Sequence, residues 1–225
     1  MNKYHIKSGL LRCSLLLLLA AISCKKQLVL SPYNQVPATQ AFTTKSDFDN
    51  AIRGVYRMML APRGTENYTS YYGGADYFSF VGAADILSDN TTRFSLGRGS
   101  ASQFHNLQAS GNSTTYFFQD GYAIIRAANA VLDNIGNLKS DPSAKNYQGQ
   151  ALAVRAMVYF DMMRIFAKTP SNASATDLGV PLVLKVTDYT ERPKRDVVSA
   201  VYAQIENDLI AAASGISASN SDVQM

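Results

Sequence analysis

Hydrophobic positions recur at spacings of three and four residues along four stretches of the chain. The first stretch, residues 46–60, begins with Ser46 as a candidate N-cap and Asp47 in its first turn. The apolar positions that follow are Phe48, Ile52, Val55, Tyr56 and Met59. This period predicts an amphipathic helix, which Pro62 and Gly64 end.

Two longer helical patterns lie in the middle of the chain. Residues 115–135 have a broad apolar face, and Gly136 is expected to close that helix. After the polar residues 137–143, a second pattern runs to about Phe166 with two apolar stripes, so most of its circumference is expected to be buried. The stripes are Ala151, Val154, Val158, Met162 and Ile165, and Leu152, Ala156, Tyr159 and Met163. Two long helices joined by a short polar loop predict an antiparallel hairpin.

The C-terminal part contains an extended stretch and a fourth helix. Residues 180–184 read Val-Pro-Leu-Val-Leu, and Asp196 is the expected N-cap of a helix that runs to Ala213 before Gly215. Residues 63–113 are rich in Gly, Ser, Thr, Asn and aromatics and predict a long irregular region. Together these patterns predict an all-α, mostly helical fold of tetratricopeptide-like hairpins with long irregular loops. Because the last helix has no partner in the pattern, we expect the sequence to be truncated.

The N-terminus has the pattern of an exported protein. Three basic residues precede an apolar run at residues 15–22, which is far shorter than the roughly 20 residues needed to cross a bilayer. Ser23-Cys24 after this run resembles the lipobox at which bacterial lipoproteins are cut and acylated. We therefore predict a signal peptide at residues 1–23, lipidation at Cys24, palmitate included, and a tether over residues 24–40. The alternative is an ordinary signal peptide with an incidental cysteine.

Composition and charge exclude several classes of function. The chain has 225 residues, of which 47% are hydrophobic and 17% charged, as in globular proteins. Its net charge of +4 comes largely from residues 1–23, which carry three of the 21 basic residues and none of the 17 acidic ones. A nearly neutral body argues against nucleic-acid binding. With Cys13 removed and Cys24 acylated, the body has no thiol for a disulfide, a metal site or a nucleophile.

The order of short motifs along the chain resembles the SusD/RagB family of outer-membrane nutrient-binding lipoproteins. Residues 147–210 match best, since small, Arg, aromatic and Asp positions are followed there by Pro181-Leu182 and by Arg195. The motifs in order are the lipobox Cys24, a Pro-containing linker, Thr43-Thr44, Gly54-Val55-Tyr56, Ser88-Asp89, residues 122–129, Ala153-Val154-Arg155-Ala156, Tyr159-Phe160-Asp161, Phe166 and Val180-Pro181-Leu182-Val183. The resemblance makes residues 41–225 the N-terminal part of a SusD-like helical domain whose C-terminal part is missing.

The resemblance implies an outer-membrane lipoprotein that binds a nutrient, a glycan or another class, and delivers it to a SusC-like TonB-dependent transporter. It implies neither catalysis nor a cofactor. Surface-exposed members usually carry acidic residues after the lipidated cysteine, whereas this chain has Lys25-Lys26. Outer-membrane anchoring is therefore implied more strongly than exposure at the cell surface. The alternative function is a helical-repeat scaffold that acts only in protein–protein docking at the envelope.

Candidate ligand contacts lie in the irregular region, from which the family draws its ligand contacts. Aromatic side chains can stack on sugar rings, while amides, carboxylates and Arg can hydrogen-bond the hydroxyls, and loops are where binding residues concentrate. An ordinary loop surface, or aromatic core at the helix ends, is the alternative. The candidates are Asp89, Asn90, Arg93, Phe94, Arg98, Phe104, His105 and Asn106, with Tyr71 and Tyr72 from an aromatic-rich segment at residues 68–80.

Polar residues on the helices favour structural roles. Arg126, Asn129 and Arg155 lie on largely apolar helices and are expected to be satisfied structural partners. Asp161 and Arg164, three residues apart, predict a pair on the helix surface. An enzyme is disfavoured, since the body has a single histidine and its carboxylate pair Asp85 and Asp89 lacks the pattern of a calcium loop. No catalytic or metal site is predicted.

Overall fold

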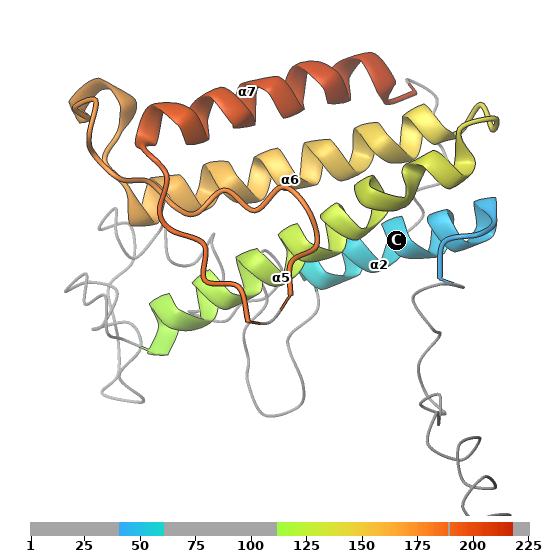
Figure 1. The fold of residues 1–225 in the computed structure, drawn as a ribbon, viewed down its shortest axis with the longest axis horizontal. Coiled ribbons are helices and arrows are strands. Elements are labelled where there is room, and N and C mark those ends of the chain that lie inside the picture. The colour runs from blue at the N-terminus through green and yellow to red at the C-terminus, as the bar shows by residue number, and fades with distance from the viewer. Residues whose placement is uncertain (1–40, 61–111, 189, 218–225) are drawn as a thin grey trace, which may run out of the picture. The chain divides into compact units, whose positions relative to one another are not determined.

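The computed structural model describes residues 41–60, 112–188 and 190–217 (Figure 1). These ranges contain the α-helices α2 (Lys45–Leu60), α5 (Asn112–Asn134), α6 (Ala144–Phe166) and α7 (Val198–Gly215), and the 3-10 helices η1 (Ile135–Leu138) and η2 (Pro170–Asn172). Within them the only β-type pairing is an isolated antiparallel bridge between Leu178 and Val197. The predicted mostly helical fold is confirmed. The predicted signal peptide, Cys24 and the tether lie outside the described residues.

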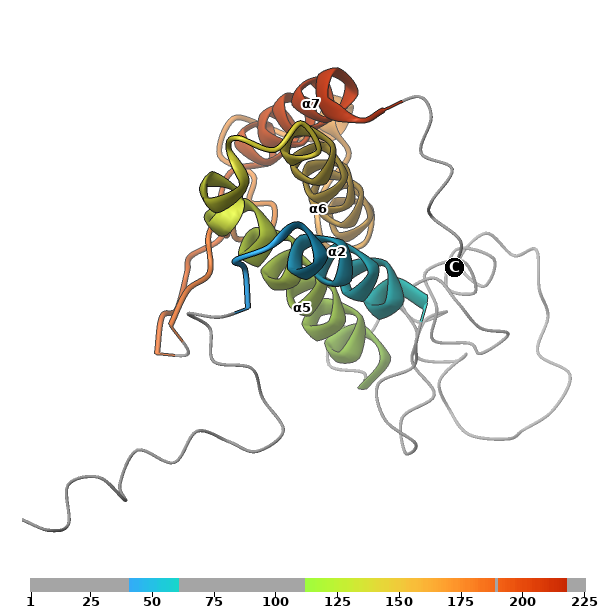
Figure 2. The ribbon, with the colours of Figure 1, turned by 90° about the vertical axis from the view of Figure 1, so that its right-hand side faces the viewer.

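The four α-helices form a series in which each runs antiparallel to the one before it in Figure 1. Helix α5 packs against both α2 and α6, and α7 packs against α6 on the side away from α5 (Figure 2). The predicted hairpin of two long helices is therefore confirmed as α5 and α6. An extended segment crosses the face of α5 and α6 between the end of α6 and the start of α7. We call its central part, residues 180–187, the strap.

Helix α2 is capped by Thr44 rather than by the predicted Ser46. The Thr44 hydroxyl oxygen accepts a hydrogen bond from the Asp47 amide at 3.3 Å, and the Asp47 carboxylate accepts one from the Thr44 amide at 2.7 Å. This reciprocal pair has the geometry of a capping box, with Asp in the place of Glu. The bonds from Thr44 and Thr43 lower the pKa of the exposed Asp47 to about 2. Ser46 already lies inside the helix, so it could not cap it.

Two further predicted helix ends are corrected. Val197, not Asp196, is the N-cap residue of α7. The Asp196 carboxylate instead accepts a hydrogen bond from the Leu182 amide at 2.7 Å, so it ties the strap to the start of α7. Gly136 does not stop the helical path at once, because the chain continues through η1, whose Leu138 is buried.

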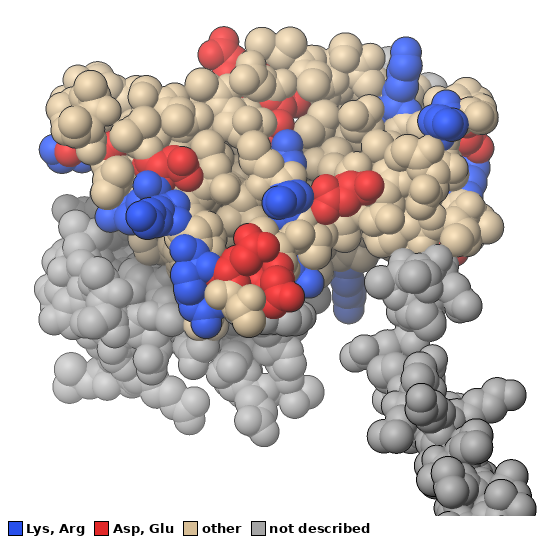
Figure 3. Space-filling view, viewed as in Figure 1, with Lys and Arg blue, Asp and Glu red and all other residues tan. Residues whose placement is uncertain are grey.

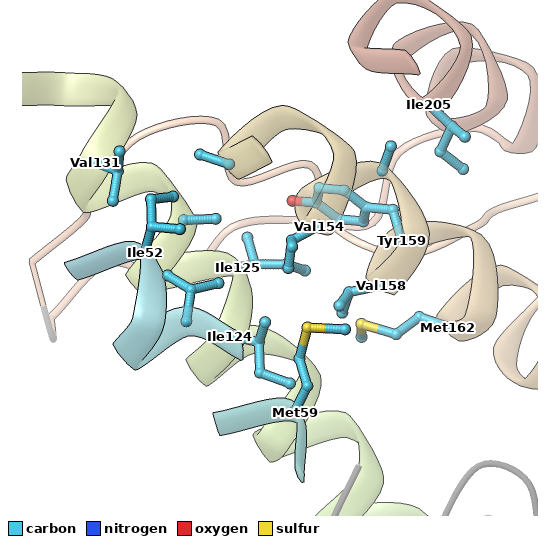
Figure 4. Packing of buried hydrophobic residues seen from close by; sticks show 14 of the residues in the cluster. Ile52, Met59, Ile124, Ile125, Val131, Val154, Val158, Tyr159, Met162 and Ile205 are labelled. Atoms are coloured by element: carbon cyan, nitrogen blue, oxygen red, sulfur yellow. The ribbon is translucent and has the colours of Figure 1, made fainter. Parts of the chain in front are cut away.

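The core draws on all four helices and on the strap (Figure 4). Both apolar stripes predicted for α6 are buried apart from Ile165, which is partly buried. Three alanines, Ala128 on α5 and Ala151 and Ala156 on α6, are fully buried and let the helices approach closely. The largest fully buried side chains are Tyr159, Phe48, Ile124, Ile125, Met162 and Met163.

Two glycines, Gly149 of α6 and Gly215 of α7, lie in close contact with the neighbouring helix or its cap residue. A Cβ atom on Gly215 would lie 2.6 Å from the Lys145 carbonyl oxygen, and one on Gly149 would lie 2.9 Å from Cγ1 of Ile216. Neither position leaves room for a larger side chain, so the glycines set the spacing of this helix pair. Gly215 therefore has a packing role in addition to its predicted position at the helix end.

Candidate functional site

The residues predicted to contact ligand all lie outside the described residues, as does the aromatic-rich segment. They remain predictions. They are Asp89, Asn90, Arg93, Phe94, Arg98, Phe104, His105, Asn106, Tyr71 and Tyr72. The carboxylate pair of Asp85 and Asp89 lies outside them too.

The densest polar arrangement in the described part of the chain is centred on Arg155 of α6. Its Nε and Nη2 atoms donate to the two carboxylate oxygens of Asp208 on α7, at 2.7 and 2.8 Å. Arg155 is 6% exposed and Asp208 3% exposed. A bidentate, desolvated pair of this kind is geometrically specific, and each partner is costly to leave alone. The pair joins α6 to α7.

Two amide side chains complete the arrangement. Nη1 of Arg155 donates to Oδ1 of Asn129 at 2.8 Å, which links the pair to α5, and Nε2 of Gln204 donates to Asp208 at 2.8 Å. Arg155, Asp208, Asn129 and Gln204 are called the Arg155 cluster below. The cluster connects the three helices α5, α6 and α7 through buried hydrogen bonds.

The Arg155 cluster also holds the backbone of the strap. Nη1 of Arg155 donates to the Leu184 carbonyl at 3.2 Å. Nδ2 of Asn129 donates to the Val183 carbonyl at 2.7 Å and to the Lys185 carbonyl at 3.3 Å. Buried backbone groups need partners, and here helical side chains supply them in place of a neighbouring strand.

A row of further side chains on α5 hydrogen-bonds to the backbone of the strap. The residues lie three or four positions apart, so they share one helix face. Tyr122 donates to the Pro181 carbonyl at 2.6 Å, Arg126 to the Thr187 carbonyl at 2.7 Å, and Asp133 accepts from the Val186 amide at 2.8 Å. Asn129 stands between them in the same row. The strap is thus bonded to α5 over its whole length.

Tyr159 of α6 also binds the strap, and its ring meets that of Tyr122 with centroids 6.5 Å apart. Its hydroxyl oxygen accepts from the Val183 amide at 2.6 Å and its hydroxyl lies 3.1 Å from the Val183 carbonyl, to which it donates. Burial raises the pKa of Tyr159 to about 12 and also raises the pKa of Tyr122. Like ordinary tyrosines, both are protonated donors at physiological pH, and the raised pKa values keep them so into more alkaline solution.

This geometry is that of a structural clamp. The charged and amide groups of the Arg155 cluster are directed at one another and at backbone carbonyls, which leaves Arg155 and Asp208 engaged in holding the fold. The predicted structural roles of Arg126, Asn129 and Arg155 are confirmed. The predicted surface pair is corrected in part, because Arg164 is half exposed but Asp161, 3.9 Å away, is buried.

The roles of Asp208, Tyr159 and Tyr122 were not predicted. Asp208 had a recognisable signal, since it is an acidic residue in the apolar stripe of α7 with Val201, Ile205 and Ala212. A charge in such a stripe requires a partner. The two tyrosines gave no comparable indication, because the same positions are also typical of tyrosines in an apolar core.

Within residues 41–60, 112–188 and 190–217, no group of three or more His, Cys, Asp or Glu side chains is arranged to hold a metal ion. No helix in these ranges has both the length and the apolar character needed to span a membrane.

Comparison with known proteins places the whole described region in one group. A family model described as "Starch-binding associating with outer membrane", SusD-like, matches residues 28–225. "SusD-like protein P2" from Formosa agariphila is 25% identical over 207 residues, which are 92% of this chain and 37% of that protein.

Solved structures show the same fold. A SusD-like carbohydrate binding protein from Bacteroides vulgatus matches with a TM-score of 0.62 and 23% identity over 79% of this chain and 37% of its own. A SusD superfamily protein from Bacteroides thetaiotaomicron matches with a TM-score of 0.57 and 24% identity over 76% of this chain and 37% of its own. The chain thus spans little more than a third of the length of these relatives.

Proposed function

Since this chain belongs to the SusD-like family of outer-membrane-associated proteins, we propose that it captures a glycan at the outer membrane and passes it to a SusC-like TonB-dependent transporter. The proposed role is binding and delivery, without a catalytic step. The observation that carries the proposal is the family match over residues 28–225, which includes every described helix.

The distribution of residue types between the described helices and the segment between α2 and α5 supports this role. In the described helices, Arg155 hydrogen-bonds to Asp208 and Asn129, and Asn129 also bonds to the strap. These buried polar groups therefore stabilise the fold. In the sequence, the residues suited to sugar recognition concentrate in the segment between α2 and α5 instead. We therefore assign ligand contact to that segment, with Arg93, Phe94 and Asn106 among its candidate residues.

Lipidation at Cys24 would hold the protein at the membrane. Several acyl chains on one residue give stable anchoring without a spanning helix. The tether of residues 24–40 would then separate the helical body from the lipid surface. Membrane anchoring through Cys24 suits a nutrient-binding protein, because the protein must pass its ligand to a transporter in the same membrane.

Calorimetric titration of the acyl-free protein, from Lys25 onward, against a panel of polysaccharides tests the proposal. The panel contains soluble starch, laminarin, xylan, pectin and alginate, and affinity gels containing the same polymers provide a second readout. We expect saturable binding to one polymer. No binding to any of them by protein with the helical circular dichroism of the native fold would contradict glycan capture and favour the docking scaffold.

Matched substitutions locate the binding surface. Replacing Arg93 or Arg98 by Ala is expected to weaken binding by about ten- to 150-fold, since a hydrogen bond from a charged donor contributes roughly 1.5–3 kcal/mol. Arg57→Ala is the control, because Arg57 is an exposed cation on α2. Equal weakening by all three substitutions would show that overall charge, rather than the loop, is responsible.

A further inference from the structure

Two aspartates on α5 and α6 are buried outside the Arg155 cluster. Asp120 of α5 is 7% exposed and Asp161 of α6 is 4% exposed. On the strap side of the molecule, by contrast, acidic side chains lie at the surface with Lys and Arg side chains close to them (Figure 3). A carboxylate that is removed from water needs hydrogen-bond donors beside it, because burying it without them is costly. Asp120 and Asp161 therefore both require nearby donors.

Both aspartates lie on the side of their helices that faces away from the strap. Asp120 comes two residues before Tyr122, and Asp161 comes two residues after Tyr159. Both tyrosines donate to carbonyls of the strap, so their side chains mark the strap side of α5 and α6. Two residues turn an α-helix by about 200°. Asp120 and Asp161 are therefore directed away from the strap.

The two aspartates also lie toward the same end of the helix pair. The ring centroids of Tyr122 and Tyr159 are 6.5 Å apart, so these two residues lie level with each other on α5 and α6. From that level, Asp120 lies toward the start of α5 and Asp161 toward the end of α6. This is the same direction, because the two helices are antiparallel (Figure 1). Both aspartates are therefore at the end of the pair where α5 begins.

Helix α2 ends at the same end of the bundle. Met59 is one residue from the end of α2, and its side chain and that of Met162 are directed at each other in the core (Figure 4). Met162 follows Asp161 directly on α6. The segment of residues 61–111 thus leaves α2 and enters α5 at the end of the bundle that carries Asp120 and Asp161.

The neighbouring cation of Asp161 lies at the surface. The Arg164 guanidinium is 3.9 Å from the Asp161 carboxylate, which is longer than a hydrogen bond, and the Arg164 side chain is 50% exposed. The same guanidinium lies over the Phe160 ring, 5.7 Å from its centroid. The buried carboxylate therefore needs donors closer than Arg164.

The chain between α2 and α5 contains suitable donors. Residues 61–111 include Ser, Thr, Tyr and Asn side chains and the cations Arg63, Arg93 and Arg98, in addition to their backbone amides. Both ends of this segment join the bundle near the two aspartates. The segment is therefore well placed to hydrogen-bond to them.

We propose that Asp120 and Asp161 anchor residues 61–111 to the helical scaffold by accepting hydrogen bonds from that segment. The importance of this anchor for binding rests on the proposed function, in which the same segment contacts the glycan. The two aspartates are then positioning residues, which hold the binding segment without touching the ligand. A segment that is held before the ligand arrives loses less conformational entropy on binding.

Limited trypsin digestion of the protein without polysaccharide tests the anchor. The segment has trypsin sites after Arg63, Arg93 and Arg98, and mass spectrometry identifies each cut. Asp120→Ala and Asp161→Ala should each raise the rate of cleavage after Arg93 and Arg98 roughly tenfold, because a hydrogen bond to a charged group contributes about that factor to the attachment of the segment. In calorimetry, polysaccharide binding should weaken by a similar factor.

A matched control and a milder variant separate the anchor from a general loss of stability. Asp133→Ala removes a carboxylate that binds the Val186 amide on the strap side of α5, so it should leave cleavage within residues 61–111 unchanged. Asp161→Asn keeps the volume of the side chain and should still raise this cleavage, because an amide oxygen accepts weaker hydrogen bonds than a carboxylate. Cleavage after Arg155, which is buried in α6, reports unfolding of the helical body.

Faster cleavage confined to residues 61–111 in the Asp120 and Asp161 variants is the expected result. Unchanged cleavage there would overturn the proposal. Cleavage that accelerates equally after Arg155 would also overturn it, because the aspartates would then stabilise the helical body as a whole. Faster cleavage with unchanged polysaccharide binding would contradict the positioning role. Failure of glycan capture is distinguishable, since the unsubstituted protein would then bind no polysaccharide while the digestion result stayed the same.

Discussion

The two sides of the α6–α7 pair differ in how completely the chain covers them. On the inner side, the strap lies over α5 and α6, and its carbonyls accept hydrogen bonds from Tyr122, Asn129 and Arg155. On the outer side, Phe160 of α6 and Ile210 of α7 lie exposed, and the Arg164 guanidinium lies over the Phe160 ring, 5.7 Å from its centroid. The same two helices therefore have one side that is closed and one that is open.

This difference shows under which conditions the fold can bury charged residues. Burying charge on the inner side is acceptable because every group of the Arg155 cluster meets a partner of matching geometry. The cluster also fixes the path of a segment that lacks regular structure. Among the described residues, the outer side has no such buried network, and its charged groups, Arg164 and Glu206, lie exposed beside apolar side chains.

The largest expected effect comes from breaking the inner side at Arg155. Arg155→Ala should lower the free energy of unfolding by about 3–5 kcal/mol, because Asp208 would remain buried without its cation. Urea denaturation followed by circular dichroism measures the change. A loss below about 1 kcal/mol would contradict the clamp.

The matched control for Arg155→Ala removes both charges together. Arg155→Met combined with Asp208→Leu should recover most of the lost stability, since apolar residues of similar volume can replace a buried ion pair at little cost. If the double variant is no more stable than Arg155→Ala, the loss comes from packing and not from the unpaired carboxylate.

Much of the helical fold could be predicted from the sequence, whereas the clamp could not. The stripes of α6 follow from its period, and Arg155 could be predicted as a structural residue from its apolar neighbours. Its partner Asp208 lies 53 residues away, and the Leu182 amide bound by Asp196 lies 14 residues away. Local sequence preference predicted Asp196 as an N-cap. In the structure, its carboxylate instead accepts a tertiary hydrogen bond from the Leu182 amide.

The proposed ligand site is the part that the sequence predicts least well. Residue types suitable for sugars can be recognised between α2 and α5, among them Arg93, Phe94 and His105. Which of them converge on one sugar depends on loop geometry, and composition carries no information on it.

A smaller effect is expected from Tyr159→Phe, which removes only the hydroxyl that binds Val183. The Val183 amide would lose its partner, at a cost of about 1–3 kcal/mol in unfolding free energy. Tyr202→Phe is the matched control on the outer side and should change stability by less than about 0.5 kcal/mol. Equal effects of the two substitutions in urea denaturation would remove the distinction between the sides.

Alkaline pH should lower the free energy of unfolding through the buried tyrosine hydroxyls that bind the strap. Burial raises the pKa of Tyr159 from 10 to about 12, so the unfolded chain loses this proton at lower pH than the folded one. The corresponding stability is fully present below pH 10 and is lost as the pH rises from 10 to 12. The loss for this residue should reach at most about 1.4 kcal/mol by pH 11.

Denaturation curves at pH 9, 10 and 11 check this prediction. Tyr159→Phe should lose less stability over this range than the unsubstituted protein does, while Tyr122 contributes in the same direction in both. An identical pH dependence in the two proteins would mean that Tyr159 is not buried against the strap.

The smallest effect is expected on the outer side. Ile210→Ala in the 225-residue chain should change the unfolding free energy by no more than about 0.5 kcal/mol, because the side chain is exposed. Ile205→Ala, on the buried side of the same helix, should cost about 2–5 kcal/mol. A large loss at Ile210 in thermal or urea denaturation would show that its side chain is packed and not exposed.

Hydrogen–deuterium exchange with and without bound polysaccharide tests most directly the central claim that the helices are a scaffold and the segment between α2 and α5 binds the glycan. We predict that saturating polysaccharide slows amide exchange within residues 71–106 and leaves the strap and α7 unchanged. Slowed exchange confined to the strap or to α7, with none in residues 71–106, would contradict the account.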